Sequence, residues 1–565
     1  MIQDTMQRLW LQSYDEEVSA QLHYENVPLY TYLDRTATAS PKRPAIVFNH
    51  CTINYARLKY LAETVAANLR AQGVRHGDRV AIMLPNLPQT IISYWGVLKA
   101  GAVVVMTNPL YMEKELTHHL TDSGARFLIT LDRLYAKIAP LRGHLPELRK
   151  IFVTGVEDGL HFPFKHLYLL RTRRAGDQIR IPFDQTALLP WKQLLKSGAA
   201  PVQPHLTPHR DLAVLQYTGG TTGVSKGVML THANMGANVH QCLAMLHRLG
   251  EKQETVLGLL PYFHIYGLTV CLNFATSIGA TLVPFPRFAP IDVLKTIHKL
   301  RPTIFPSAPA VFQALLQHKD IQKYDLSSIQ YCISGSAPIP QETINTFKDL
   351  TGSEIIEGFG LTEASPITHL NPLRKTRKIG SIGLPFPDTD ACIVDMEVGS
   401  LALPPGKVGE LVIRGPQVMH GYWNRPDETA TALRNGWLYT GDIAYMDEQG
   451  YFFIVDRKKD MIISGGYNIY PREIDEVLYE HPDIQEAVTV GIAHPTRGEI
   501  VKAFVVPRQG VELPKSEIIG YCRQKLANYK VPKKIEFRTE LPKTMVGKVL
   551  RRALREEEEQ KKASS

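Results

Sequence analysis

The chain has 565 residues, of which 44% are hydrophobic and 21% are charged. This composition is typical of globular proteins with a large core, and the length favours two or more domains over one. The 64 Lys and Arg residues against 55 Asp and Glu residues give a mild, diffuse basic excess, which suits anionic ligands or a lipid surface but does not indicate nucleic-acid binding.

The cysteines and the N-terminus indicate the compartment. The six cysteines are scattered without CxxC spacing, so we expect reduced thiols in a cytoplasmic protein. The N-terminus lacks a basic start followed by an apolar block, which argues against a secretory signal. The nearest approach to a membrane span, residues 91–106, is interrupted by Lys99 and predicts a buried helix that leads into a strand.

Helices and apolar strands alternate early in the chain. After an irregular lead-in to about residue 30, apolar side chains recur at helical spacing within residues 55–70. The expected elements then follow in turn: a strand at 79–84, a helix ending at residue 99, a strand at 102–105, a helix at 113–122 and a strand at 126–130. Nearly continuous apolar strands that alternate with helices predict a buried parallel sheet in an α/β fold.

The segment from about 158 to 195 interrupts this alternation. Residues 161–174, HFPFKHLYLLRTRR, mix aromatic and leucine side chains with four Lys or Arg residues. Two interpretations are open: an amphipathic segment on a membrane surface, or a solvated excursion from the protein surface, which we favour.

The alternation resumes at residue 211. Strands are expected at 256–261, 303–306 and 328–334, and a turn at Gly335, Ser336 and Ala337 opens a helix. After about residue 380, short strands between Gly and Pro turns, such as 409–415, predict a small β-rich subdomain.

A polar run at 456–460 separates this subdomain from a compact final piece. That piece has expected helices at 471–480 and 514–526, strands at 487–491 and 501–506, and a final charged helix. We place a domain boundary at the polar run and expect the charged tail 555–565 to fray.

A loop rich in glycine and hydroxyl side chains follows the apolar run 213–215 and reads YTGGTTGVSKG. Glycines let backbone N–H groups approach an anion, hydroxyls add donors and Lys226 adds a positive charge, so the loop suits a phosphate. It is not a Walker A loop, because Ser225 precedes the lysine and Gly227 follows it. A flexible surface loop is the alternative. The candidate nucleotide-binding residues are Tyr217, Thr218, Gly219, Gly220, Thr221, Thr222, Gly223, Ser225 and Lys226.

A second motif, residues 357–363, reads EGFGLTE. Phe359 offers a flat apolar face on which adenine can stack, and Thr362 can hydrogen-bond a phosphate. Glu363 is a hard oxygen ligand suited to Mg²⁺ on ATP phosphates, although such an acid alone also suits a surface or a helix cap. The candidate residues are Glu357, Gly358, Phe359, Gly360, Thr362 and Glu363.

Three more motifs each contain a single candidate. Asp442 in GWLYTGD is expected just past a tight turn, where its carboxylate can accept both ribose hydroxyls; the alternative is an Asx turn. His264 in PYFHIYG follows a strand end, where α/β sheets bind ligands; the alternative is a core histidine. For Lys548 in PKTMVGK, composition alone favours a solvated lysine, although a lysine so placed can stabilise charge that develops at a phosphate.

Taken together, these ordered motifs resemble those of the adenylate-forming superfamily, which contains acyl-CoA synthetases, firefly-type luciferases and peptide-synthetase adenylation domains. The resemblance extends through residues 77–111, 415–423 and 456–471, so it covers nearly the whole chain. Among the superfamily, the sequence looks most like the bacterial long-chain fatty acid–CoA ligases.

The resemblance implies a two-domain architecture and a role for each motif. It implies a large N-terminal adenylation domain, 1–458, made of parallel-sheet α/β subdomains plus a small β-rich subdomain. A small mobile α+β C-terminal domain, 459–565, would turn about Lys459 as a hinge. Asp442 and Arg457 would bind the ribose, His264 would lie near the substrate carboxylate, and Lys548 would be the catalytic lysine, with Thr362 and Glu363 also catalytic. Further nucleotide or pantetheine contacts would come from Gly335, Ser336, Ala337, Lys459, Gly465, Gly466 and Tyr467.

The implied reaction joins a fatty acid to CoA at the expense of ATP, with Mg²⁺, through an acyl-AMP intermediate. A medium-chain or aryl acid ligase, an enzyme that stops at acyl-AMP, and a binding protein without turnover remain as alternatives. Some long-chain enzymes gate the lipid tunnel with a Trp where this chain has Leu268, so that gate is not carried over. Peripheral contact with the inner face of the membrane and a homodimer also stay open.

Overall fold

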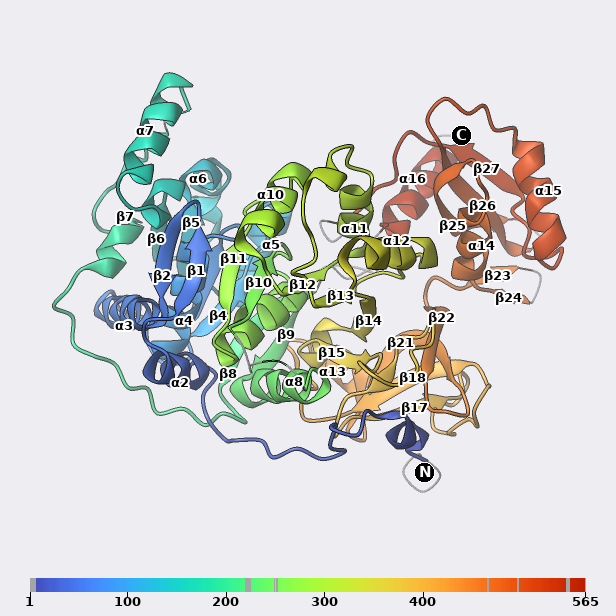
Figure 1. Ribbon diagram of the computed structural model, residues 1–565, viewed down its shortest axis with the longest axis horizontal. Helices are drawn as coiled ribbons and strands as arrows, with labels where there is room; N and C mark the ends of the chain where they lie inside the picture. Colours follow the sequence, from blue (N-terminus) through green and yellow to red (C-terminus); the bar gives the residue numbers. More distant parts are fainter. Residues whose placement is uncertain are drawn as a thin grey trace.

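Four β-sheets and the helices packed on them form the part of the chain that the computed structural model describes, residues 7–177, 179–218, 225–247, 249, 253–464, 467–494, 497–544 and 549–563. Two large sheets lie toward one end of the molecule and a small C-terminal unit lies at the other (Figure 1). The mixed α/β fold with a smaller C-terminal part confirms the predicted fold class.

The first large sheet has eight strands, and the six from β8 to the edge strand β7 are parallel. Their apolar runs are buried on both faces, as expected for parallel strands. In spatial order the strands are β19 (Gly421–Tyr422), β9 (Lys226–Thr231), β8 (Leu212–Thr218), β4 (Val103–Met106), β3 (Arg79–Met83), β5 (Phe127–Leu131), β6 (Lys150–Thr154) and β7 (Leu188–Pro190).

The second large sheet has nine strands and is parallel from β14 to β1. In spatial order they are β16 (Leu384–Pro385), β15 (Ile367–Leu370), β14 (Ile355–Gly360), β13 (Tyr331–Ser334), β12 (Ile304–Ser307), β10 (Thr255–Gly258), β11 (Thr281–Pro284), β1 (Pro44–Phe48) and β2 (Cys51–Asn54).

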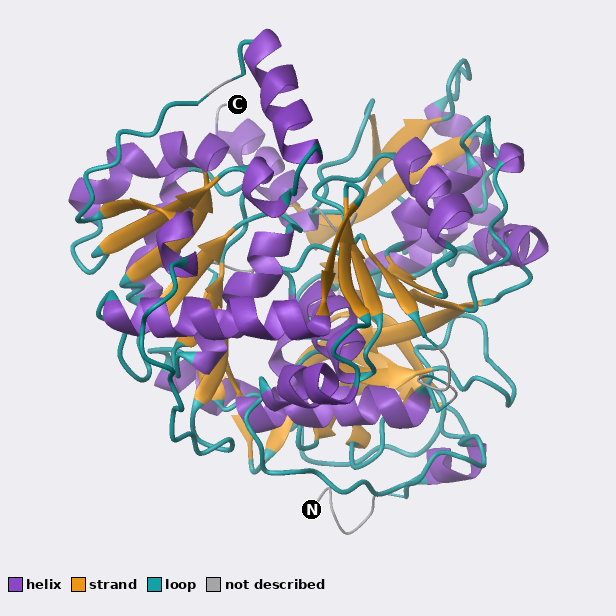
Figure 2. Cartoon of the chain, turned by 60° about the vertical axis from the view of Figure 1, so that its left-hand side comes forward, coloured by secondary structure: helices purple, strands orange, loops and turns teal. Residues whose placement is uncertain are grey.

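Helices fill the space between the two large sheets and cover their outer faces (Figure 2). The shared core contains side chains of both sheets together with α2 (Thr31–Ala39), α3 (Tyr55–Ala71), α4 (Pro88–Lys99), α8 (His232–Met245) and the π-helix η5 (Gly267–Phe274). The outer layers are α5 (Glu113–Ser123) and α6 (Asp132–Ile138) on one sheet, and α10 (Pro290–Leu300), α11 (Pro309–Leu316) and α12 (Gln341–Thr351) on the other. Every residue of α4 is buried, which confirms the prediction of a buried helix that leads into a strand.

The predicted small β-rich subdomain is present, and its sheet is antiparallel. Its strands are β17 (Asp390–Val394), β18 (Gly409–Arg414), β20 (Leu433–Arg434), β21 (Trp437–Met446) and β22 (Phe452–Arg457). The C-terminal unit has its own core and contains β23 (Ile462–Ser464), β24 (Tyr467–Ile469), β25 (Ile484–His494), β26 (Gly498–Pro507), β27 (Lys534–Phe537), α14 (Pro471–Tyr479), α15 (Lys515–Lys525) and α16 (Arg551–Ala563).

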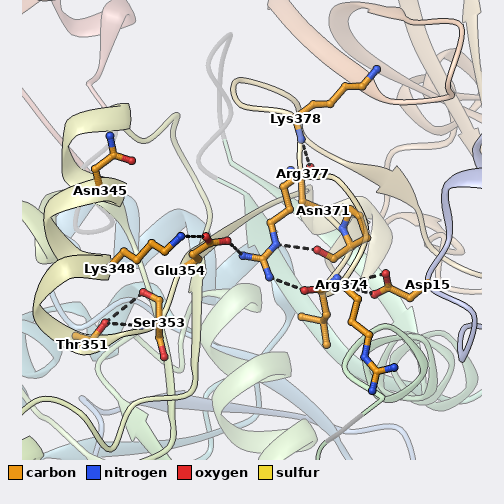
Figure 3. Close-up of polar contacts among 12 residues, drawn as sticks. Asp15, Asn345, Lys348, Thr351, Ser353, Glu354, Asn371, Arg374, Arg377 and Lys378 are labelled. Carbon is orange, nitrogen blue, oxygen red and sulfur yellow. Dashed lines mark hydrogen bonds and ion pairs between the residues drawn. The ribbon is translucent and has the colours of Figure 1, made fainter.

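The irregular N-terminal segment is hydrogen-bonded to the loop that follows β15 (Figure 3). The buried Asp15 carboxylate accepts backbone N–H groups of Leu373, Arg374 and Lys375 at 2.8–3.2 Å. Burial alone would raise the pKa of Asp15, but these hydrogen bonds outweigh it and lower the pKa. In the same loop, Arg377 pairs with Glu354, the residue just before β14.

The expectation that residues 555–565 fray is wrong for the described part of the tail. α16 continues to Ala563. Its acidic side chains meet basic partners: Glu558 pairs with Lys502 of β26 at 2.7 Å, and Glu557 with Arg538 at 2.6 Å. A charged tail is ordered here because the neighbouring sheet supplies the opposite charge.

Candidate active site

Several candidate residues meet at one edge of the nine-stranded sheet. β12, β13 and β14 are parallel neighbours with Ser334 opposite both Ser307 and Glu357, so their carboxyl ends lie together. The bend at 335–337 follows β13, and Glu357–Gly360 form the end of β14. Open α/β sheets bind their ligands at this edge.

The predicted phosphate loop opens from the end of the β8–β9 hairpin. Thr218 and Lys226 pair across the hairpin, and Gly219, Gly220, Thr221, Thr222 and Gly223 lie outside the described residues. Tyr217 turns away toward α5, where its hydroxyl donates to Asp122 Oδ2 at 2.6 Å and its ring lies 4.2 Å from the His119 ring. The carbonyl of Ser225 lies 3.0 Å from His118 Nε2, so α5 supports both ends of the loop.

Lys226 and Glu363, the two charged candidates, are joined by Tyr422. The Lys226 ammonium lies 4.9 Å from the centre of the Tyr422 ring, and the Tyr422 hydroxyl donates to Glu363 Oε1 at 2.7 Å. Burial and the charge of Glu363 raise the pKa of Tyr422, so its hydroxyl remains a donor. β19 pairs with β9, placing Tyr422 beside Val228, and this pairing brings the two motifs together.

Glu428 occupies the other side of Lys226. It lies on α13 (Pro426–Ala432), just after β19, and its carboxylate forms an ion pair with the Lys226 ammonium. Lys226, which we predicted to bind a phosphate, is therefore already paired with a carboxylate of the protein.

β14 presents the second motif as an extended strand rather than as a free loop. Phe359 is partly buried, with its ring centre 6.0 Å from that of His369 on β15. A Cβ on Gly360 would come within 2.3 Å of the Pro366 carbonyl, so the strand pairing requires glycine there. Burial raises the pKa of Glu357 to about 7, against the opposing charge of Arg472 on α14. Thr362 and Glu363 follow on the short 3₁₀ turn η7 (Thr362–Ala364).

Asp442 lies inside β21, not just past a tight turn as predicted, because Gly441 with φ +71° is accommodated within the strand. Arg457 on β22 is its cross-strand neighbour, and Arg457 Nε lies 2.9 Å from Asp442 Oδ1. Asp442 is only 2% exposed, and its Oδ2 has no hydrogen-bond partner among the described residues. A buried carboxylate oxygen without a donor suits a ligand hydroxyl. The nearby charges of Asp442 and then Asp460 and Glu363 raise the pKa of Arg457 despite its burial.

His264 lies between β10 and the π-helix η5. Its Nδ1 accepts the backbone N–H of Tyr266 at 3.3 Å, and its carbonyl accepts Leu268 N at 3.0 Å. β10 ends at Gly258, three residues earlier than predicted, because the Asn86 side chain donates to the carbonyls of Gly258 and Leu260. A Cβ on Gly267 would lie 2.3 Å from the Pro261 carbonyl, which fixes a glycine at the start of η5.

An almost closed apolar cavity lies behind this edge, with a volume of about 10 Å³. Its lining comes from α8, η5, β13, β15 and the loop after β16: Cys242, Leu246, Val270, Phe274, Ile333, Ile367, Leu370 and Phe386. A much larger depression of about 770 Å³ runs along α5. Its lining includes Asp122, which accepts the Tyr217 hydroxyl, and Arg425, the ion-pair partner of Asp122.

The polar turn 458–460 separates β22 from β23, and a helix of the C-terminal unit is hydrogen-bonded to it. Arg555 of α16 donates to the carbonyls of Lys459 and Asp460 at 3.1 and 2.9 Å. Arg472 spans the two units, because its Nη1 donates to Ile454 O and its backbone N to Asp456 Oδ2. Burial and the charge of Arg457 lower the pKa of Lys459.

The remaining predicted residues belong to the C-terminal unit. Tyr467 begins β24 and stacks on Tyr529 with 4.5 Å between ring centres. Gly465, Gly466 and Lys548 lie outside the described residues. Sequence reasoning missed Glu428 and Arg472 and assigned no role to Tyr422, because no local pattern marks a partner that only tertiary pairing supplies.

Comparisons with known proteins agree with this arrangement. Residues 33–423 match the model of the family described as AMP-binding enzyme, and residues 473–548 match the AMP-binding enzyme C-terminal domain. The chain belongs to the AMP-binding enzyme family. The enzyme is 48% identical to a long-chain-fatty-acid–CoA ligase of Bacillus subtilis over 98% of each chain.

Two solved structures have the same fold as this AMP-binding enzyme. The anthranilate CoA ligase AuaEII in complex with anthranoyl-AMP is 28% identical, with a TM-score of 0.84 over 96% of this chain and 100% of that one. ATP-bound MatB from Rhodopseudomonas palustris is 29% identical, with a TM-score of 0.81 over 94% and 99%. Within the described residues, the enzyme has no helix long and apolar enough to cross a bilayer.

Proposed function

We propose that this AMP-binding enzyme is a long-chain fatty acid–CoA ligase. The observation on which the proposal rests is that candidates from four separate motifs come together: Tyr422 joins Lys226 to Glu363, and the charge of Glu363 raises the pKa of Arg457, the ion-pair partner of Asp442. The closely related Bacillus subtilis protein, which is similar over nearly its whole length, has the same named activity.

The first half-reaction is the attack of the fatty acid carboxylate on the α-phosphorus of ATP. A phosphorus–oxygen bond forms to the carboxylate, the bond to the β-phosphate breaks, and pyrophosphate leaves. Lys226 and the hydroxyl groups of the 218–225 loop hold the departing phosphates, and Asp442 accepts ribose hydroxyls with its free oxygen. Adenine lies against the partly exposed Phe359.

Glu363 has the donor chemistry for Mg²⁺, a hard carboxylate oxygen close to the phosphate-binding lysine. When bound, the metal neutralises charge on the phosphates. The Tyr422 hydroxyl orients the Glu363 carboxylate for that task.

In the second half-reaction the sulfur of CoA attacks the acyl carbonyl and AMP leaves. We assign the change between half-reactions to a rotation of residues 459–565 relative to 1–458 about Lys459. Lys548 acts in the first half-reaction, where a positioned donor is worth roughly 3–4 kcal/mol of transition-state stabilisation. The bonds of Arg472 to Ile454 and Asp456 cross the proposed boundary and must break in any large rotation.

The acyl chain enters the apolar interior between α8 and η5. The cavity of about 10 Å³ does not accommodate a chain, so side chains such as Val270 and Phe274 must move apart as the chain enters. We assign contact with the carboxylate end to His264, which lies three residues before η5.

CoA-dependent AMP release across a panel of acids tests this proposal. We expect the highest kcat/KM with long-chain fatty acids and loss of AMP release in Lys548→Ala. A preference for aryl or medium-chain acids would replace the long-chain assignment. Pyrophosphate release with accumulation of acyl-AMP, and without CoA-dependent AMP release, would indicate an enzyme that stops at acyl-AMP.

A further inference from the structure

The helix α7 (Phe164–Arg174) projects from the edge of the eight-stranded sheet, far from the C-terminal unit (Figure 1). None of its residues is buried. The mechanism proposed above uses no side chain of α7, and none of them lines the apolar cavity.

One face of α7 packs on the body of the protein and the other is free. Phe164 and Tyr168 contact the main core, and the Phe164 ring stacks on His50 with 5.1 Å between centres. The opposite face is exposed at helical spacing and consists of Leu167, Leu170, Arg171 and Arg174.

Large apolar side chains are concentrated on this exposed segment. Phe162 is 80% exposed, Leu167 58% and Leu170 54%. Ile179 and Phe183, in the chain that leaves the helix, are also exposed. Isolated exposed apolar side chains are common, but such a cluster marks an interaction surface.

The same segment is strongly basic. Residues 161–183 contain five Lys or Arg residues against one Asp, a formal net charge of +4 out of +9 for the whole chain. Lys165 pairs with Asp158. Among the described residues, Arg171, Arg173 and Arg174 have no carboxylate within 4 Å. Their charge is therefore available to an external partner.

We propose that the exposed face of α7 and its flanks, residues 162–177 and 179–183, bind an anionic lipid surface. Leucines and arginines share this face, and the arginines have no acidic partner among the described residues, so the face complements an extended anionic surface. That combination suits the lipid headgroup region, where apolar side chains enter the acyl boundary while the long arginine side chains extend to anionic headgroups. Such contact would hold the enzyme beside its apolar substrate, a benefit that depends on the proposed function, although the binding itself does not.

Sedimentation of the full chain with lipid vesicles tests the proposal without ATP, CoA or turnover. We expect binding to vesicles of phosphatidylglycerol and phosphatidylcholine at low salt, and at least tenfold weaker binding to phosphatidylcholine alone. Arg171→Ala with Arg174→Ala should weaken binding to the anionic vesicles by roughly 30-fold, at about fivefold for each arginine near such a surface. Leu167→Ser with Leu170→Ser should also weaken binding to the anionic vesicles. The loss should be larger at high salt, where the charge contribution to binding is screened.

The matched control removes two exposed basic residues from α15, at the opposite end of the molecule (Figure 1). Lys515→Ala with Arg523→Ala should bind vesicles like the unmodified enzyme. All variants should keep acyl-CoA formation with a detergent-dispersed acid, which shows that they fold. Absence of binding to anionic vesicles, or equal loss in the α7 and α15 variants, would overturn the proposal and leave α7 to another partner or to solvent.

Discussion

The Tyr422 hydroxyl lies 2.7 Å from Glu363 Oε1, while the Tyr422 ring lies under the ammonium of Lys226. One side chain thus connects the proposed metal ligand to the proposed phosphate ligand. In Tyr422→Phe the ring stays and only the hydrogen bond is lost, which for a charged acceptor is worth about 1.5–3 kcal/mol. We expect the Mg²⁺ concentration for half-maximal activity to rise about tenfold, measured by titration at saturating ATP. The matched change Tyr439→Phe, which removes a hydrogen bond to Gly399 in the β-rich subdomain, should leave it unchanged.

Glu428 competes with the triphosphate for Lys226. The ion pair is partly exposed, so its contribution is at most about 1 kcal/mol. Glu428→Gln should therefore lower the KM for ATP two- to fivefold with little change in kcat, in steady-state assays at saturating acid and CoA. A raised KM would instead mean that Glu428 positions the lysine for the nucleotide.

The free oxygen of Asp442 predicts discrimination between nucleotides. The unmodified enzyme should use 2′,3′-dideoxy-ATP at least 100-fold less efficiently than ATP, because a buried acceptor is then left unpaired. Asp442→Ala should lose most of this discrimination, with kcat/KM for ATP falling toward that for the analogue. Discrimination that survives intact in this variant would assign ribose binding elsewhere.

Glu357 predicts a pH effect on stability. Its folded pKa of about 7 exceeds the ordinary value of 4.5, so between these values the folded state binds more protons than the unfolded state. Stability contributed by the protonated group is full below pH 4.5 and is lost as the pH rises toward 7. Relative to Glu357→Gln, the unmodified protein should lose stability across this window in urea unfolding followed at several pH values. A constant difference between the two proteins would show that Glu357 titrates normally.

The sequence predicted the elements well where one strong pattern decided each of them. The alternation of apolar strands and helices predicted β3, β4, α5 and β5 to within two residues at each end, and it predicted the last residue of α4. β10 is shorter than predicted because the side chain of Asn86, from a distant segment, donates hydrogen bonds to the carbonyls of Gly258 and Leu260. The charged C-terminal tail was wrongly predicted to fray, because its basic partners, Lys502 and Arg538, come close to it only in the folded structure.

The site was predicted as a set of motifs but not as a network. Lys226, Glu363 and Asp442 could be selected because each residue type has a chemical reason to bind part of ATP. The partners Tyr422, Glu428 and Arg472 could not, because strand pairing between β9 and β19 and the contact of α14 with β22 bring them into place. Tyr217 was selected with the loop, yet its side chain serves the contact with α5.

Exchange of labelled pyrophosphate into ATP, measured without CoA, isolates the adenylation of a long-chain fatty acid at this site. We expect rapid exchange only when a long-chain fatty acid is present, and loss of exchange in both Lys226→Ala and Lys548→Ala. Exchange that ignores the fatty acid, or that persists at the normal rate in these variants, would contradict adenylation at this site.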